Sequence, residues 1–197
     1  NSVVPLSASP SVLDPYPCGW SRLEDEELYE DGPPEWPYDF YGFEQRYYEV
    51  QYPAPGAPDL AARVRALLTA PATPVSDEPR RGLDHGAYVP LVEMYPQADI
   101  PVLQISMPTL DPSTLVDVGR RLSPLRDEGT LIIGSGFATH NLRLMIPGGG
   151  SVPSWSAEFD HWLSEMVEVG DLDSLINFCH AAPAATTAHP TTEHFAP

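Results

Sequence analysis

The 197-residue chain is long enough for one domain with a sizeable core, and its 42% hydrophobic content argues against general disorder. It carries 28 acidic residues against 10 basic ones, a formal net charge of -18. This balance argues against a nucleic acid partner, because the phosphate backbone requires a basic surface. All the basic residues are arginine, so chemistry that needs a lysine amine is excluded.

The sequence shows no sign of a membrane span or a disulfide framework. No apolar run approaches the roughly 20 residues that a membrane-spanning helix needs, so we expect no membrane partner. The two cysteines, Cys18 and Cys179, lie far apart and lack the CxxC spacing of a zinc site. We interpret them as unpaired thiols in a reducing compartment, which favours the cytoplasm.

The N-terminal part is rich in proline, acidic and aromatic residues. We expect a short strand at Val3–Leu6 and then an acidic, proline-rich excursion over about residues 10–37, interpreted as a solvated loop. The aromatic residues that follow either line a pocket for a planar ligand or pack in the core, and the sequence favours neither reading. The candidates for a pocket wall are Tyr38, Phe40, Tyr41 and Tyr48.

Several segments have apolar residues at helical spacing, and most also have a proline, an acidic cap or a glycine at an end. The predicted helices cover Pro58–Leu68, Val89–Met94, the segment from Pro112 to Leu122 behind the cap Asp111, the segment with Trp155 and Met166 that Gly170 closes, and Leu172–Cys179. The tail from Ala181 onward is low in complexity and apolar periodicity, yet it carries His189, Glu193 and His194.

Two apolar runs with strand character, Pro101–Ser106 and Leu131–Ile133, alternate with these helices. This order predicts an α/β fold with a mostly parallel or mixed sheet. The second run continues through two glycines and delivers His140 at the carboxyl edge of the sheet, where α/β proteins keep their chemistry. No repeat and no linker is visible, so we predict a single domain over residues 1–197.

Three of the six histidines, His85, His140 and His194, stand in turns beside Gly, Asn or Glu. Imidazole is the commonest transition-metal ligand and titrates near neutral pH, so the three histidines suit a shared metal or proton-transfer site. The same pattern is equally compatible with three solvent-exposed histidines that have no functional role. His161 and His180 lie in helical patterns next to core aromatics, and we interpret them as structural or surface residues.

Six segments have distinctive sequences in a fixed order. They are YDFYGF at Tyr38–Phe43, YPAPGAPDLA at Tyr52–Ala61, GLDHGAYVPLVEMYPQADIPVLQIS at Gly82–Ser106, LRDEGTLIIGSG at Leu125–Gly136, THNLR at Thr139–Arg143 and HPTTEHF at His189–Phe195. Together they resemble the class III extradiol ring-cleavage dioxygenases of the LigB-like superfamily, most closely the DOPA-dioxygenase branch. The resemblance covers most of residues 38–197.

The resemblance implies an α/β sandwich around a central mixed sheet flanked by helices. It implies a non-haem Fe(II), with Zn(II) as an alternative occupant, that opens a catechol ring beside its hydroxyls with O₂. On the matching motifs, His194 is implied as a metal ligand and His140 as the acid/base histidine or a further metal ligand. His85 is implied as a histidine that contacts substrate or oxygen. The implied partners are a catecholic small molecule and O₂, and self-association is left open.

Two family motifs, GHGSP and SAHW, each supply a metal-binding histidine and do not occur in this sequence. We therefore expect N- and C-terminal parts of the domain to be absent from the chain as given. The expected function is extradiol ring opening of a DOPA-like substrate. The alternative is a shortened, non-catalytic paralogue that binds an aromatic ligand or a partner subunit.

Overall fold

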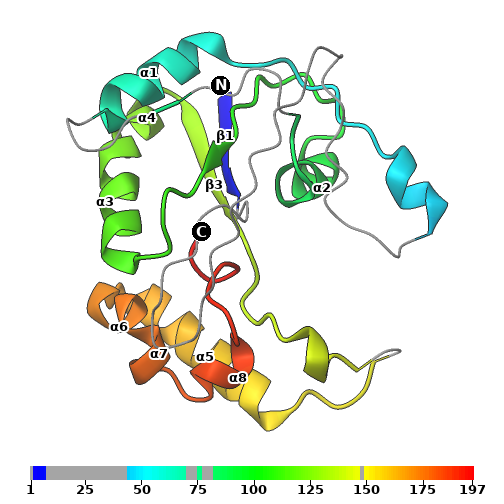
Figure 1. The fold of residues 1–197 in the computed structure, drawn as a ribbon, viewed down its shortest axis with the longest axis vertical. Helices are drawn as coiled ribbons and strands as arrows, with labels where there is room; N and C mark the ends of the chain where they lie inside the picture. The colour runs from blue at the N-terminus through cyan, green and yellow to red at the C-terminus, as the bar shows by residue number, and fades with distance from the viewer. Residues whose placement is uncertain (1, 8–43, 70–74, 77–81, 147–148) are drawn as a thin grey trace. The chain divides into compact units, whose positions relative to one another are not determined.

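The computed structural model describes residues 2–7, 44–69, 75–76, 82–146 and 149–197 (Figure 1). Within these ranges the chain divides into two compact units. The first unit comprises residues 2–7, 44–107 and 116–135, and the second comprises residues 108–115 and 136–197, with the gaps just given. The predicted acidic excursion and the pocket candidates Tyr38, Phe40 and Tyr41 lie outside the described residues.

A three-stranded sheet lies in the first unit. Strand β1 (Ser2–Ser7) pairs in parallel with β2 (Ile105–Ser106) on one side and with β3 (Thr130–Ser135) on the other. A separate parallel bridge joins Gly56 to Val102. The strands predicted around Val3 and Ile132 are therefore present, whereas the predicted strand at Pro101–Ser106 is reduced to its last two residues. Strands and helices together confirm the α/β content of the prediction.

Helices pack against both faces of β3, since successive strand residues point to opposite sides. Ile132 packs in a cluster with Val64, Leu122 and Leu125, whereas Ile133 packs in a cluster with Tyr88 and Leu91. The first cluster draws on α1 (Pro58–Leu68), α3 (Pro112–Leu122) and α4 (Pro124–Asp127), and the second on α2 (His85–Met94). The bounds of α1 and α3 are as predicted, and the Asp111 carboxylate accepts the N–H of Thr114 as the expected cap of α3.

Helix α2 begins four residues earlier than predicted, at His85 rather than at Val89. The reason is Asp84, whose buried carboxylate accepts the N–H of Ala87 at 3.1 Å and so caps the first turn. Gln104 fixes this cap from a neighbouring segment, because its amide donates to the other Asp84 oxygen at 2.6 Å. His85 therefore occupies the first position of a helix rather than a turn between glycines.

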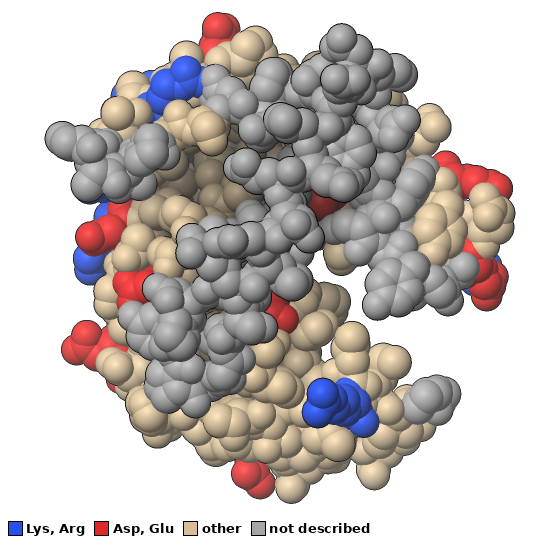
Figure 2. All heavy atoms as spheres, viewed as in Figure 1, with Lys and Arg blue, Asp and Glu red and all other residues tan. Residues whose placement is uncertain are grey.

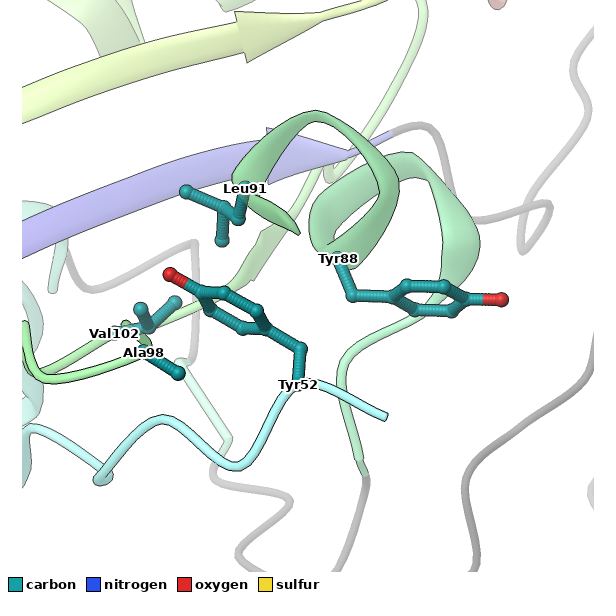
Figure 3. Close-up of a cluster of buried hydrophobic side chains, with 5 residues drawn as sticks. All are labelled: Tyr52, Tyr88, Leu91, Ala98 and Val102. Atoms are coloured by element: carbon teal, nitrogen blue, oxygen red, sulfur yellow. The ribbon is translucent and has the colours of Figure 1, made fainter. Parts of the chain in front are cut away.

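The core beside α2 is built around Tyr52. Figure 3 shows Leu91, Ala98 and Val102 around its ring. Tyr88, which lies in α2 like Leu91, belongs to the same cluster. The Tyr52 hydroxyl donates to the backbone carbonyl of Tyr95 at 2.9 Å, so the one polar atom of this buried ring has a partner. Upstream, a short 3-10 helix η1 (Gln45–Glu49) carries Tyr48.

The second unit is helical where it is described. Helix α5 (Ser154–Val169) ends at Gly170, whose φ of 70° is the left-handed conformation that glycine adopts without strain. Phe159 of α5 is buried against Phe178 and Ala188, and Trp155 and Trp162 pack at the edge of this cluster. A short 3-10 helix η2 (Leu142–Leu144) precedes α5.

The single helix predicted over Leu172–Cys179 is wrong, because the structure has α6 (Leu172–Ile176) and then α7 (Phe178–Ala181). The break lies at Asn177, whose side-chain amide donates to the carbonyl of Asp173 at 2.9 Å. Such local side-chain bonds compete with regular helix geometry.

The tail from Ala181 onward, whose sequence shows little apolar periodicity, nevertheless contains a short helix. It contains α8 (Ala185–Ala188) and buries Ala185, Ala188 and His189. Four alanine and threonine residues are too short a run to show an apolar period, so the tail had no detectable pattern.

Three further observations concern the described residues. No helix among the described residues is long and apolar enough to cross a membrane. On the face drawn in Figure 2, the charged side chains of described residues lie in small separate groups among uncharged ones. His161 of α5 and His180 of α7 are exposed, in agreement with their interpretation as structural or surface residues.

Candidate metal and catalytic site

Gly136 begins the segment of the second unit that carries His140. A β-carbon at this position would overlap the carbonyl oxygen and carbon of His194, so only glycine lets the two backbones approach so closely. The next residue uses this approach, since the N–H of Phe137 donates to the carbonyl of His194 at 2.8 Å. The glycine predicted to end the strand thus has a second role at the site.

Three more hydrogen bonds join the segment 136–141 to the segment 187–194. The N–H of His140 donates to the carbonyl of Ala188 at 2.8 Å, and the side-chain amide of Asn141 donates to the carbonyl of Thr187 at 2.7 Å. His189 Nε2 lies 2.8 Å from the carbonyl oxygen of Ala138. Because a carbonyl only accepts, the proton of this imidazole is on Nε2. We call these three bonds, together with the bond from Phe137 to His194, the loop–tail ladder.

The loop–tail ladder brings two predicted site residues together. The ring centroids of His140 and His194 lie 3.6 Å apart with an interplanar angle of 33°. Glu193 joins them, and one ligand atom from each of the three residues lies within 4.8 Å of the other two. The second unit therefore holds two imidazoles and one carboxylate in a single group that could hold a metal ion.

Glu193 supplies a test of whether a cation fits this group. One carboxylate oxygen accepts a hydrogen bond from the Thr191 hydroxyl at 2.7 Å, whereas the other, Oε2, is buried with no hydrogen-bond partner. A buried carboxylate oxygen without a donor is costly, and a bound cation offsets that cost. Two histidines with one carboxylate are also the donor set of many non-haem Fe(II) sites and suit Zn(II). The residues present therefore fit a metal ion.

His189 lies beside this group but differs from it electrostatically. Burial lowers its pKa from the ordinary value, and the nearby His140 adds to that shift. The Ala138 carbonyl and the charge of Glu193 oppose it, and the net direction is downward. The imidazole is therefore neutral near neutral pH. Its Nδ1 atom is buried and has no hydrogen-bond partner.

An exposed aromatic ring borders both histidines. Phe137 is 61% exposed, and its ring centroid lies 5.7 Å from that of His140 and 5.6 Å from that of His194. Phe137 thus places one apolar ring beside both imidazoles, and aromatic side chains are common in the lining of small-molecule sites.

The remaining predicted site residues belong to the first unit or are not described. His85 is exposed at the first position of α2, and Tyr48 is half-buried in η1. Tyr38, Phe40 and Tyr41 lie outside the described residues. Sequence reasoning did not propose Glu193, His189 or Phe137. Glu193 had one usable signal, since it stands directly before His194 in the HPTTEHF segment.

The chain is similar in sequence to a known protein family and to several known proteins. Residues 30–197, which span both units, match the protein family described as the catalytic LigB subunit of aromatic ring-opening dioxygenase. The chain is 46% identical over 162 residues to a 4,5-DOPA dioxygenase extradiol of Beta vulgaris. That alignment covers 81% of this chain and 60% of the relative. A protein of Escherichia coli K12 with the same name is 38% identical over 165 residues, with the same coverage.

A crystal structure of an uncharacterized protein from Escherichia coli K12 is also similar, with a TM-score of 0.69 and 30% sequence identity. The similarity covers 100% of this chain and 72% of that one. The chain thus spans about three-fifths of the length of the curated relatives it matches. These findings confirm the resemblance predicted from the six sequence segments, and the chain belongs to the LigB family of aromatic ring-opening dioxygenases.

Proposed function

We propose that this protein is an extradiol dioxygenase that opens the ring of a catecholic, DOPA-like substrate with O₂. The observation that carries the proposal is the group of His140, Glu193 and His194, whose ligand atoms lie within 4.8 Å of one another. Membership of the LigB family and the names of the similar proteins from Beta vulgaris and Escherichia coli support the same reaction.

The metal in this proposal is Fe(II) for activity, with Zn(II) as an alternative occupant. His194 and Glu193 would hold it, with His140 as a further ligand in one of the two roles open to that residue. When bound, such a metal supplies Lewis acidity toward the catechol hydroxyls and redox chemistry toward O₂. The carboxylate of Glu193 is oriented by the Thr191 hydroxyl, so its buried second oxygen is the one available to a cation.

His140 has two roles open to it: a metal ligand, or the base that takes a proton from a substrate hydroxyl. Its backbone N–H donates to the carbonyl of Ala188, and its ring lies tilted against that of His194. Its position is therefore fixed in either role. The two roles separate in a His140→Gln variant. Loss of metal affinity would indicate a ligand, whereas retained affinity with a changed pH–rate profile would indicate a base.

The remaining assignments follow from the family resemblance and the described surface. We propose His85 as a histidine that contacts substrate or oxygen, since the Asp84 cap and its Gln104 partner fix its backbone. For the aromatic wall of the pocket we propose Tyr38, Phe40, Tyr41 and Tyr48, as expected from the sequence. We add Phe137, because its exposed ring borders both histidines.

At the level of the whole protein, we propose one catalytic domain in which a central mixed sheet is flanked by helices. The match of one family to residues in both units supports a single domain. The proposed location is the cytoplasm, the proposed partners are a catechol and O₂, and self-association is compatible with the proposal. We propose no nucleic acid partner and no membrane partner. The net charge of -18 argues against nucleic acid binding.

The proposal is tested by loading the protein anaerobically with Fe(II), adding L-DOPA and then admitting O₂. The expected result is oxygen uptake with formation of a yellow ring-opened product. A His194→Ala variant should give neither, whereas exchange of the exposed His161 for alanine should leave both unchanged. Wild-type protein with confirmed Fe(II) but no oxygen uptake would contradict the proposal. L-DOPA binding without oxygen uptake would favour the non-catalytic alternative.

A further inference from the structure

His189 is a buried imidazole that the proposed chemistry does not use. Its side chain is 1% exposed, and its ring centroid lies 5.3 Å from Phe159, 5.3 Å from Phe195 and 6.0 Å from Phe178. A polar ring in an aromatic environment costs free energy unless its polar atoms find partners. The position would accept an apolar ring more cheaply, so the imidazole needs a reason.

That reason lies in its bond to the loop that carries His140. His189 Nε2 donates to the carbonyl of Ala138, two residues before His140 and 51 residues away in sequence. In the loop–tail ladder, the other three bonds use backbone carbonyls of the tail. The bond from His189 is therefore the one bond of the loop–tail ladder that uses a side chain of the tail. The strength of this bond depends on the amino acid at position 189.

The two functions of the ring exclude simple replacements. Phenylalanine would fill the space among Phe159, Phe178 and Phe195 but would leave the Ala138 carbonyl without this donor. Glutamine places its amide nitrogen where histidine has Nε2, whereas asparagine places its amide nitrogen where histidine has Nδ1. The position therefore offers a matched pair of amide variants that differ in which ring nitrogen they imitate.

We propose that His189 is a positioning residue: by donating from Nε2 to Ala138, it holds the His140 loop against the tail that carries Glu193 and His194. His189 does not itself bind the metal or move a proton in this scheme. The inference rests on the proposed function only for its kinetic consequence. The geometric consequence, a preassembled metal-binding group, stands without any ring-opening activity.

The test compares His189→Gln, His189→Asn and His189→Phe with the wild-type protein and with a control variant, His161→Gln, on the exposed surface of α5. Zn(II) affinity is measured by competition with a chromophoric chelator, and amide hydrogen exchange is followed at Phe137 and His140. Loss of a partner that orients a metal ligand typically costs about 10–100-fold in metal affinity. We expect a loss in that range for the Phe and Asn variants, with faster exchange at both amides.

The Gln variant should stay within about threefold of the wild type in Zn(II) affinity, since it restores the donor at the Nε2 position. Equal losses in the Gln and Asn variants would overturn the proposal, as would wild-type affinity and exchange in the Phe variant. If the Phe variant fails to fold, the Gln and Asn pair alone decides. An Asn variant that binds zinc better than the Gln variant would assign the role to Nδ1 instead.

Kinetics separate this inference from the proposed function. If the wild type opens DOPA, the Asn variant should lose kcat with little change in KM, because the loop holds a reacting group rather than the substrate body. If the wild type with bound Fe(II) shows no turnover, the proposed function fails, while the zinc and exchange measurements still decide the role of His189.

Discussion

Two buried side chains of the first unit, Asp84 and Tyr52, differ in their hydrogen bonding from the buried polar side chains around the candidate metal group. In the first unit, the carboxylate of Asp84 is capped by the N–H of Ala87 and by the amide of Gln104, and the hydroxyl of Tyr52 donates to Tyr95. In the second unit, Glu193 Oε2, His189 Nδ1 and Asn141 Oδ1 are buried without hydrogen-bond partners. Partnered polar groups specify a fold at little cost, whereas unpartnered ones cost stability.

The contrast agrees with the proposed metal group in the second unit. A buried polar atom that lacks a protein partner is retained where something else provides the partner, and two of these three atoms belong to residues beside or within the candidate metal group. The buried polar groups named in the first unit are satisfied by the chain itself. Four predictions test this division, in order of decreasing expected effect.

The largest effects should come from the two cores. We expect Phe159→Ala in the second unit to lower the free energy of unfolding by about 3–5 kcal/mol and Leu91→Ala in the first unit to lower it by about 2–5 kcal/mol. Both side chains are fully buried. Chemical denaturation measures the change. The two variants should differ in Zn(II) affinity, measured under conditions where both are folded. Only Phe159→Ala should reduce that affinity. A reduction by Leu91→Ala would contradict the division.

Removal of a metal-binding side chain should be the next largest effect. We expect His194→Ala and Glu193→Gln to weaken Zn(II) binding by more than about 100-fold, beyond the loss typical of an orienting partner. The metal-free Glu193→Gln variant should also be at least as stable as the wild type, because a buried, partly unsatisfied charge has been removed. Calorimetric titration and thermal melting with and without a chelator measure both. Unchanged affinity in Glu193→Gln would remove Glu193 from the group.

The helix caps of the two units offer a smaller, matched comparison. Asp84 caps α2 and Asp171 caps α6, and each accepts the backbone N–H three residues on. Exchange of a cap for alanine costs about 0.5–2 kcal/mol. We expect Asp84→Ala to lie at the upper end, because Asp84 is buried and its loss leaves the Gln104 amide without this acceptor. Denaturant titration of both variants measures the difference, and an equal or larger cost for Asp171→Ala would contradict it.

The smallest effect concerns pH. Burial, followed by the proximity of His140, lowers the pKa of His189 in the folded state below the ordinary value of 6.5. The unfolded chain therefore binds this proton more readily. The stability contributed by neutral His189 is complete above about pH 6.5 and is lost as the pH falls below it. Thermal melts of the metal-free protein from about pH 8 to about pH 5 should show this loss. The loss should be smaller in His189→Gln and unchanged in His161→Gln.

Local signals in the sequence predicted a good part of the fold. Pro58 and Asp111 marked helix starts, and Gly170 marked a helix end, because caps and fixed φ angles act within one turn of the chain. Sequence reasoning failed where a distant residue or a competing side chain decided the outcome. Gln104 supports the early start of α2 at His85, and the Asn177 amide divides a helix.

The candidate site shows the same limit more clearly. His140 and His194 were found because their motifs resemble those of a known family, not because any local pattern joins them. Ala138 and His189, whose bond holds the two segments together, stand 51 residues apart. No periodicity or spacing rule covers such a contact, so Glu193 and His189 were noted in the tail without a role. The prediction that His85 shares their site stays a prediction.

Gly136 has a consequence for how variants of this protein should be interpreted. It carries no functional group, yet its α-carbon faces the backbone of His194 so closely that any side chain would displace this proposed metal ligand. A genetic screen for loss of activity should therefore place Gly136→Ala in the same class as replacements of His194. A geneticist who assigned roles from side-chain chemistry alone would have no reason to expect it.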